Sequence, residues 1–139
     1  MLVLILIMLV FLHPVAMAEE AKNGLNEVEK RLFVSFSMPQ TLLSQSFEQA
    51  ERFHITVVFN GLIDNSMPET ASKLSKLTKR YPELSIQIDP VAFEDFAIDA
   101  VPALVVSQGQ VFDVVRGNLS LSDALSLIHE RGELKGKVL

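Results

Sequence analysis

The chain has 139 residues, a formal net charge of −5 and no cysteine. This length fits one domain, and the absence of cysteine excludes disulfides, thiol-based redox catalysis and thiolate metal sites. The negative charge disfavours a nucleic-acid partner, because phosphate binding needs clustered cations.

The first 18 residues are typical of a secretory signal peptide. Residues 1–12 are all apolar, but this run is too short to span a bilayer comfortably. His13-Pro14 interrupts it, and Ala16-Met17-Ala18 places small residues where signal peptidase requires them. Neither Lys nor Arg precedes the apolar run, so an uncleaved anchor is the alternative. We expect cleavage after Ala18, with membrane contact only during export.

A charged linker is expected over residues 19–31, followed by a strand over 32–36 that is rich in aromatic and β-branched residues. A helix is expected next. Ser37 is typical of an N-cap, Pro39 of the first turn, and Gln40 completes a capping box. The helix should bury one apolar stripe, made of Leu43, Phe47 and Ala50.

Residues 54–60 have a nearly continuous apolar stretch, broken only by Thr56 between Ile55 and Phe59, which predicts a strand in the interior of a sheet. A loop over 61–65 leads to a second Ser-Met-Pro triplet, in which Ser66 is again expected to cap a helix. This helix ends at Pro82. Its inward residues are expected to be Leu74, Leu77 and Tyr81. Its cations, which we interpret as a solvated face, are Lys73, Lys76, Lys79 and Arg80.

The second half predicts a strand over 84–88, a turn at Asp89-Pro90 and one or two helical turns within 91–98. Two antiparallel strands follow, over 104–106 and 111–115. The remaining expected features are a hairpin turn at Gln108-Gly109, a closing turn at Gly117-Asn118, a last helix that starts near Ser120 and buries Leu121, Leu125 and Ile128, and a frayed tail over 132–139.

The order of these elements predicts an α/β fold with a central mixed sheet flanked by helices. A β-α-β start makes the first two strands parallel, and the closing hairpin is antiparallel. Together with Val101-Pro102 directly before the penultimate strand, this layout resembles the thioredoxin-like fold, in particular the periplasmic DsbC type. In that family the first helix starts with Cys-x-x-Cys and a cis-proline faces it. Here Ser37-Met38-Pro39-Gln40 takes that place, without the sulfurs.

A second resemblance covers most of the expected domain at residues 32–131. The segments that carry it resemble TrbC, the pilin-assembly family of F-type conjugative transfer systems. It implies a periplasmic protein of a type IV secretion apparatus that works with TraW and other transfer-apparatus proteins. The matching segments are Phe33-Val34-Ser35-Phe36-Ser37-Met38-Pro39, Gly61-Leu62-Ile63-Asp64-Asn65-Ser66, Ile88-Asp89-Pro90, Phe93, Ile98, Val101-Pro102-Ala103 and Phe112-Asp113-Val114-Val115-x-Gly117-Asn118.

We expect no catalytic residue, no metal site and no cofactor. Ser37 lacks a G-x-S-x-G elbow, so a helix cap explains it better than a nucleophile. His54 and His129 are scattered, and Asp64, Asp89, Asp95 and Asp99 lack calcium-loop spacing. Three isolated glycines indicate turns rather than a phosphate loop, namely Gly61, Gly109 and Gly117.

A protein-binding face is the remaining site hypothesis. In a thioredoxin-like fold, the start of the first helix and the proline loop converge on one exposed face, which can bind an extended segment. The alternative is that these residues are merely packed or solvated. The leading function is a non-enzymatic assembly factor, ahead of a chaperone-like peptide-binding domain and a hydrolase using Ser37. The residues expected on the face are Ser37, Met38, Pro39, Val101, Pro102 and Ala103.

Overall fold

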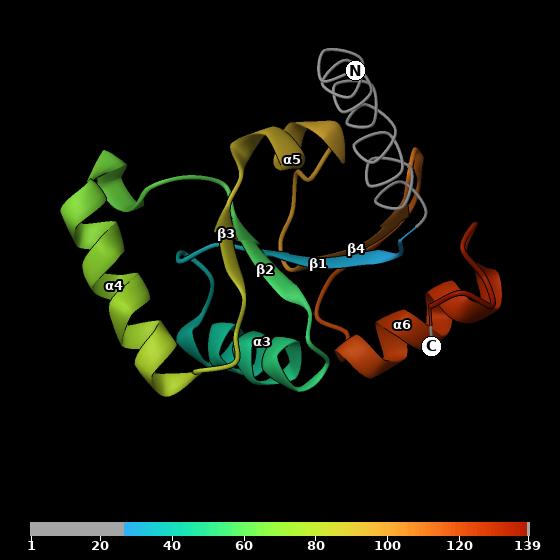
Figure 1. Cartoon of the computed structure of the whole chain (residues 1–139), viewed down its shortest axis with the longest axis horizontal. Coiled ribbons are helices and arrows are strands. Elements are labelled where there is room, and N and C mark those ends of the chain that lie inside the picture. The colour runs from blue at the N-terminus through green and yellow to red at the C-terminus, as the bar shows by residue number, and fades with distance from the viewer. Residues whose placement is uncertain (1–26, 139) are drawn as a thin grey trace, which may run out of the picture.

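The computed structural model describes residues 27–138, so the expected signal peptide and most of the expected linker lie outside the described residues (Figure 1). The strands are β1 (Glu29–Val34), β2 (Thr56–Phe59), β3 (Ile86–Ile88), β4 (Ala103–Gln108) and β5 (Val111–Arg116). The helices are α3 (Gln40–Arg52), α4 (Met67–Arg80), α5 (Pro90–Asp95) and α6 (Leu121–Arg131), with a short 3-10 turn, η1 (Ile63–Asn65).

The five strands form one mixed sheet in the order β3-β2-β1-β4-β5. β1 pairs in parallel with β2, and β2 in parallel with β3. β4 is antiparallel to both β1 and β5. The predicted parallel start and antiparallel hairpin are therefore confirmed, and so is the interior position of the second strand.

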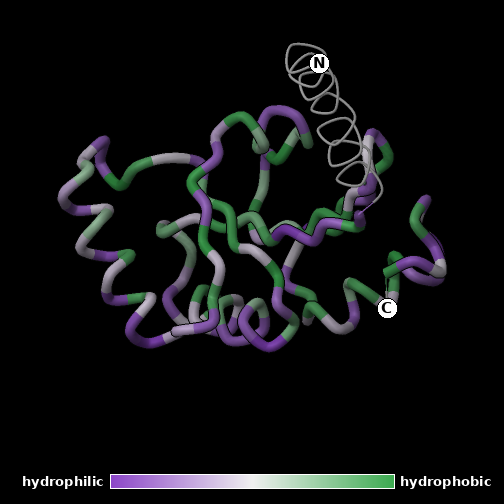
Figure 2. The backbone as a smooth tube through the Cα atoms, viewed as in Figure 1, coloured by the Kyte–Doolittle hydropathy of each residue, from purple (hydrophilic) through white to green (hydrophobic). Residues whose placement is uncertain are grey.

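Two clusters of buried side chains lie on opposite faces of the sheet. The larger one joins the stripe of α3, which includes Leu43 and Phe47, to Leu125 and Ile128 of α6. The smaller one lies under α5, where the rings of Phe33 and Phe93 meet edge to face at 4.9 Å. Figure 1 shows α3 and α6 below the sheet and α5 above it, while Figure 2 shows the hydrophobic residues gathered in the central strands.

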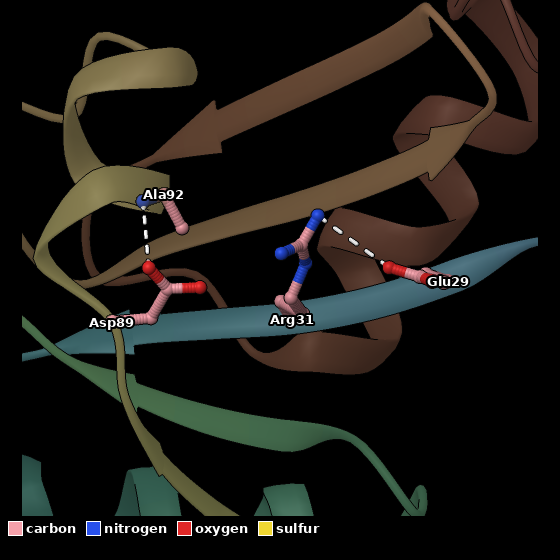
Figure 3. Close-up of polar contacts among 4 residues, drawn as sticks. All are labelled: Glu29, Arg31, Asp89 and Ala92. Atoms are coloured by element: carbon pink, nitrogen blue, oxygen red, sulfur yellow. Dashed lines mark hydrogen bonds and ion pairs between the residues drawn. The ribbon is translucent and has the colours of Figure 1, made fainter.

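The first strand begins three residues earlier than the sequence predicts, because β1 starts at Glu29. Arg31 pairs with Thr56 of β2 in the sheet and places its guanidinium 4.7 Å from the ring centre of Phe96. It also forms a 3.5 Å ion pair with Glu29 (Figure 3). The charged residues at 29–31 therefore belong to the sheet and not to a linker, which corrects the expected boundary.

The described part of the expected C-terminal tail (132–138) is packed rather than frayed, which corrects the second boundary. Leu134 and Val138 are only 2% and 1% exposed and belong to the larger core cluster. The backbone N–H groups of Glu133 and Leu134 donate to the two carboxylate oxygens of Asp113, at 2.9 Å each. These bonds hold the segment after α6 against β5.

Asp89-Pro90 starts a helix instead of making a simple turn. The carboxylate of Asp89 accepts a hydrogen bond of 3.0 Å from the backbone N–H of Ala92 (Figure 3). Asp89 is thus the N-cap of α5, and Pro90 occupies the first helical position, where its missing N–H costs nothing. The short helix is thereby fixed over the end of the sheet.

Candidate protein-binding cleft

The segment between β1 and α3 does not form the predicted serine cap. Pro39 occupies the N-cap position, and no side chain caps the helix. The Ser37 hydroxyl instead lies 2.7 Å from the Ser35 hydroxyl, which also accepts from the Ser37 backbone N–H. Gln40 is the first helical residue. The predicted capping box is therefore wrong, since the helix begins too late for Ser37 to reach its free N–H groups.

Met38 is turned towards the core. Its backbone N–H donates to the carbonyl oxygen of Ser35 at 3.1 Å, which closes a tight turn. Its sulfur lies 3.4 Å from the backbone nitrogen of Ser35, and its side chain packs against the larger core cluster. This partly buried methionine supports the turn and contributes little to an exposed face.

The loop before β4 carries the second half of the expected face. The Val101–Pro102 peptide bond is cis, the geometry that the resemblance implied. The carbonyl oxygen of Pro102 accepts from the N–H of Gly117 at 3.0 Å, and Ala103 is 1% exposed. Ala103 is thus part of the sheet core and is not available at the surface.

Val101 differs from Pro102 and Ala103 because its backbone groups form no hydrogen bond with the described residues. Within residues 27–138, neither its N–H nor its carbonyl oxygen has a hydrogen-bond partner. Its side chain is partly buried against the cluster under α5. An unpaired backbone at the end of a sheet is the feature that a strand-adding segment uses.

A cleft of about 580 Å³ opens at the carboxyl ends of the parallel strands β1 and β2. Ser37, between β1 and α3, and Val101, before β4, both line this cleft. Met38, Pro39 and Ala103 do not line it. Pro102 lines a separate, small hollow against α3 and α6. The structure thus brings together two of the six residues expected on the face.

The remaining walls come from residues that the sequence did not single out as binding residues. The ring of Phe36 lines the cleft and stacks on Phe59 at 4.1 Å, nearly parallel. The loop after β2 and the loop before β4 supply most of the other lining residues, namely Asn60, Gly61, Leu62, Ile63, Asp64, Ile98, Asp99 and Ala100. Several of these residues belong to the segments that resemble the TrbC family. That resemblance was the only sequence signal for them.

Gly61 and Gly117 have different local roles. A Cβ atom built on Gly61 meets no atom within 4 Å, so this position faces open space in the cleft. Gly117 has a φ of +108°, which favours glycine. The backbone N–H of Gly117 donates to the carbonyl oxygen of Pro102, and the neighbouring Asn118 lines the small hollow.

The cleft carries acidic groups and lacks the partners that a serine nucleophile needs. Asp64 and Asp99 are among its lining residues, and the carboxylate of Asp99 forms a 3.4 Å ion pair with Arg116 of β5. No histidine is among the lining residues, and the Ser37 hydroxyl is engaged with Ser35. Within residues 27–138 no group of three His, Asp or Glu side chains is arranged to hold a metal ion.

The arrangement of sheet and helices matches known thioredoxin-like domains. StoA from Bacillus subtilis superimposes with a TM-score of 0.53 and 11% identity, over 71% of this chain and 80% of that one. The N-terminal domain of PilB from Neisseria gonorrhoeae superimposes with a TM-score of 0.55 and 18% identity, over 78% of this chain and 81% of that one. The chain is therefore a thioredoxin-like α/β domain, here without cysteine.

Sequence relatives identify the family. Residues 32–128 match the family described as the type-F conjugative transfer system pilin assembly protein, and the chain belongs to this TrbC family. The periplasmic protein TrbC of Escherichia coli (strain K12) is 35% identical over 103 residues, which are 74% of this chain and 49% of that protein. The chain thus spans about half the length of this curated relative.

Within residues 27–138, none of the helices has the length and apolar character that a bilayer crossing requires.

Proposed function

We propose that this chain is a non-enzymatic assembly factor of an F-type conjugative pilus, which acts in the periplasm by binding a TraW-like protein of the transfer apparatus. The observation that carries this proposal is the cleft between Ser37 and Val101, beside the open backbone of Val101. Membership of the TrbC family supports the pathway, and the name of the relative in Escherichia coli supports the compartment.

The cleft suits an extended polypeptide segment. Such a segment would pair its backbone with the free N–H and carbonyl groups of Val101. Its side chains would meet the exposed part of Phe36 and of the loop at Leu62 and Ile63 on one wall. The cleft volume of about 580 Å³ accommodates a few side chains, as small binding sites generally do.

Binding is favoured over chemistry because the groups that chemistry needs are missing from the cleft. A thioredoxin-type redox reaction requires thiols, and the chain has no cysteine. Serine catalysis requires a base within hydrogen-bond reach of the hydroxyl. The nearest polar partner of the Ser37 hydroxyl is another hydroxyl, at 2.7 Å.

Filling the cleft tests the proposal. In Gly61→Phe the new ring enters open space, so the fold should survive. The matched control is Ser122→Phe, which adds the same ring at an exposed position of α6. We expect Gly61→Phe to weaken binding of the purified TraW-like protein by at least about tenfold, and to reduce pilus number and mating frequency. The control should change the affinity less than about twofold.

The cleft is not the docking site if a folded Gly61→Phe variant binds the TraW-like protein as tightly as the control does. Equal binding of unrelated unfolded polypeptides by the unmodified chain would instead favour the chaperone-like alternative. Isothermal titration calorimetry gives the affinities, and circular dichroism establishes that each variant is folded.

A further inference from the structure

The solvent side of α4 carries a group of cationic side chains, which we call the basic face: Lys73, Lys76, Lys79 and Arg80. All four are exposed. At 100° per residue they lie within an arc of roughly 120° along the helix. Figure 1 shows α4 at the edge of the molecule. The sequence interpretation treated these residues only as a solvated face.

The ion pairs in the described part of the domain do not involve the basic face. The ion pairs found within residues 27–138 are Arg31 with Glu29 and Arg116 with Asp99, and neither involves α4. Like charges at helical spacing repel one another and destabilise the helix slightly. The chain has a net charge of −5, yet this face carries four cations and one acidic residue, Glu69, which lines the same hollow as Lys73 and Lys76. Among the described residues no ion pair joins Glu69 to these lysines, so the face keeps a net positive charge.

The opposite side of α4 faces the domain. Thr70 is buried there, Leu74 is partly buried, and Leu77 packs against the larger core cluster. The basic face therefore has no apolar side chains of its own to insert into a lipid surface, and an interfacial helix needs such a side. This favours an acidic protein segment over a membrane as the occupant.

The basic face adjoins the cleft. A second hollow of about 570 Å³ lies beside α4 and shares Ile63 with the wall of the cleft. Lys73 and Lys76 line this hollow. The Nζ atom of Lys73 lies 4.7 Å from the ring centre of Phe36, whose side chain belongs to the cleft. A polypeptide that leaves the cleft past Ile63 therefore meets the basic face next.

From this continuity and the unpaired charges we propose that the basic face binds an acidic segment of the protein partner, next to the segment that occupies the cleft. The inference rests on the proposed function, because it extends the same docking surface. Complementary charge at the rim of an interface acts mainly on the association rate and on its dependence on salt. Asp or Glu side chains in the bound segment would form ion pairs with Lys73 and Lys76.

A charge-removal variant with a matched control tests this inference. The basic-face variant is Lys73→Gln with Lys76→Gln and Lys79→Gln. The control removes three exposed cations elsewhere, in Arg52→Gln with Arg131→Gln and Lys135→Gln, so both variants have the same net charge. With the TraW-like protein as probe, we expect the basic-face variant to lose about tenfold in affinity at physiological salt and the control less than about twofold.

Carbodiimide cross-linking locates the contact, because it joins a lysine amine directly to a carboxylate. In periplasmic extract from cells with the transfer apparatus, we expect amide links from Lys73 or Lys76 to Asp or Glu residues of that partner. Links only within the chain or to a second copy overturn the inference. So does basic-face-dependent binding to vesicles of phosphatidylcholine and phosphatidylglycerol (7:3) without any loss of affinity for the partner.

The two proposals fail in different ways. If Gly61→Phe loses the partner and the basic-face variant keeps it, only this inference is overturned. If both variants bind normally, the proposed function of the cleft is overturned as well. If the basic-face variant and its control lose affinity equally, net charge explains the effect and the inference is overturned.

Discussion

The same three residues, Ser-Met-Pro, start two helices in different ways. At the start of α4, Ser66 is the N-cap, and its hydroxyl accepts from the backbone N–H of Glu69 at 3.4 Å. Met67 is 62% exposed there. At the start of α3, Ser37 does not cap, and Met38 is turned to the core. Identical local sequence thus yields a helix cap in one place and a cleft wall in the other.

The surroundings of each triplet explain the difference. Before the first triplet, the end of β1 places the Ser35 carbonyl where it accepts the Met38 N–H, and the Ser35 hydroxyl where it meets Ser37. The chain is thereby held in a turn, and α3 begins one residue after Pro39. Before the second triplet no strand constrains the chain, so the serine adopts its preferred capping position.

The largest expected contrast is between the two methionines. Met38→Ala removes a side chain that packs on the larger core cluster, and we expect it to lower the free energy of unfolding by about 2 kcal/mol. Met67→Ala is the matched control. It removes an exposed side chain and should cost less than about 0.5 kcal/mol. Urea unfolding of each variant measures the difference.

Equal costs for the two methionine variants would contradict the inward position of Met38. A change in the slope of the urea transition would indicate an altered denatured state rather than lost packing.

An intermediate effect is expected at Thr70, which stabilises the second triplet from inside α4. Its hydroxyl donates to the Ser66 carbonyl at 2.7 Å and accepts from the Ile63 N–H at 2.9 Å. Thr70→Val keeps the volume and removes both bonds, so it should cost about 1.5 kcal/mol. Thr78→Val is the control, since Thr78 is exposed on the same helix. If Thr70→Val and Thr78→Val lower the midpoint of thermal unfolding equally, the buried bonds of Thr70 do not stabilise this loop.

Sequence patterns predicted the order of the strands and helices because each one buries its own periodic apolar residues. They failed where a contact joins distant segments. The charged start of β1 is stabilised by Arg31 stacking on Phe96, and the tail is held by Asp113. Such contacts leave no local pattern. The same holds for the cleft. Ser37 and Val101, which line it, were expected on one face, whereas Phe36 lines it because its ring packs on Phe59, a contact between distant segments.

The smallest expected contrast is between the two serines, and it tests the comparison most directly. Ser66→Ala removes the hydroxyl that caps α4 and should cost about 0.7 kcal/mol, at the weaker end of N-cap effects because the bond is 3.4 Å long. Ser37→Ala removes an exposed hydroxyl bonded to Ser35 and should cost less than about 0.3 kcal/mol.

Native-state hydrogen exchange resolves the serine contrast better than global unfolding does. Ser66→Ala should raise the exchange rate of amides in the first turns of α4, whereas Ser37→Ala should leave α3 unchanged, because α3 has no serine cap to lose. If Ser37→Ala speeds exchange in α3 as much as Ser66→Ala does in α4, then Ser37 caps its helix in solution. The two triplets would then be equivalent, and the cleft would lose the distinct local structure that separates it from an ordinary helix start.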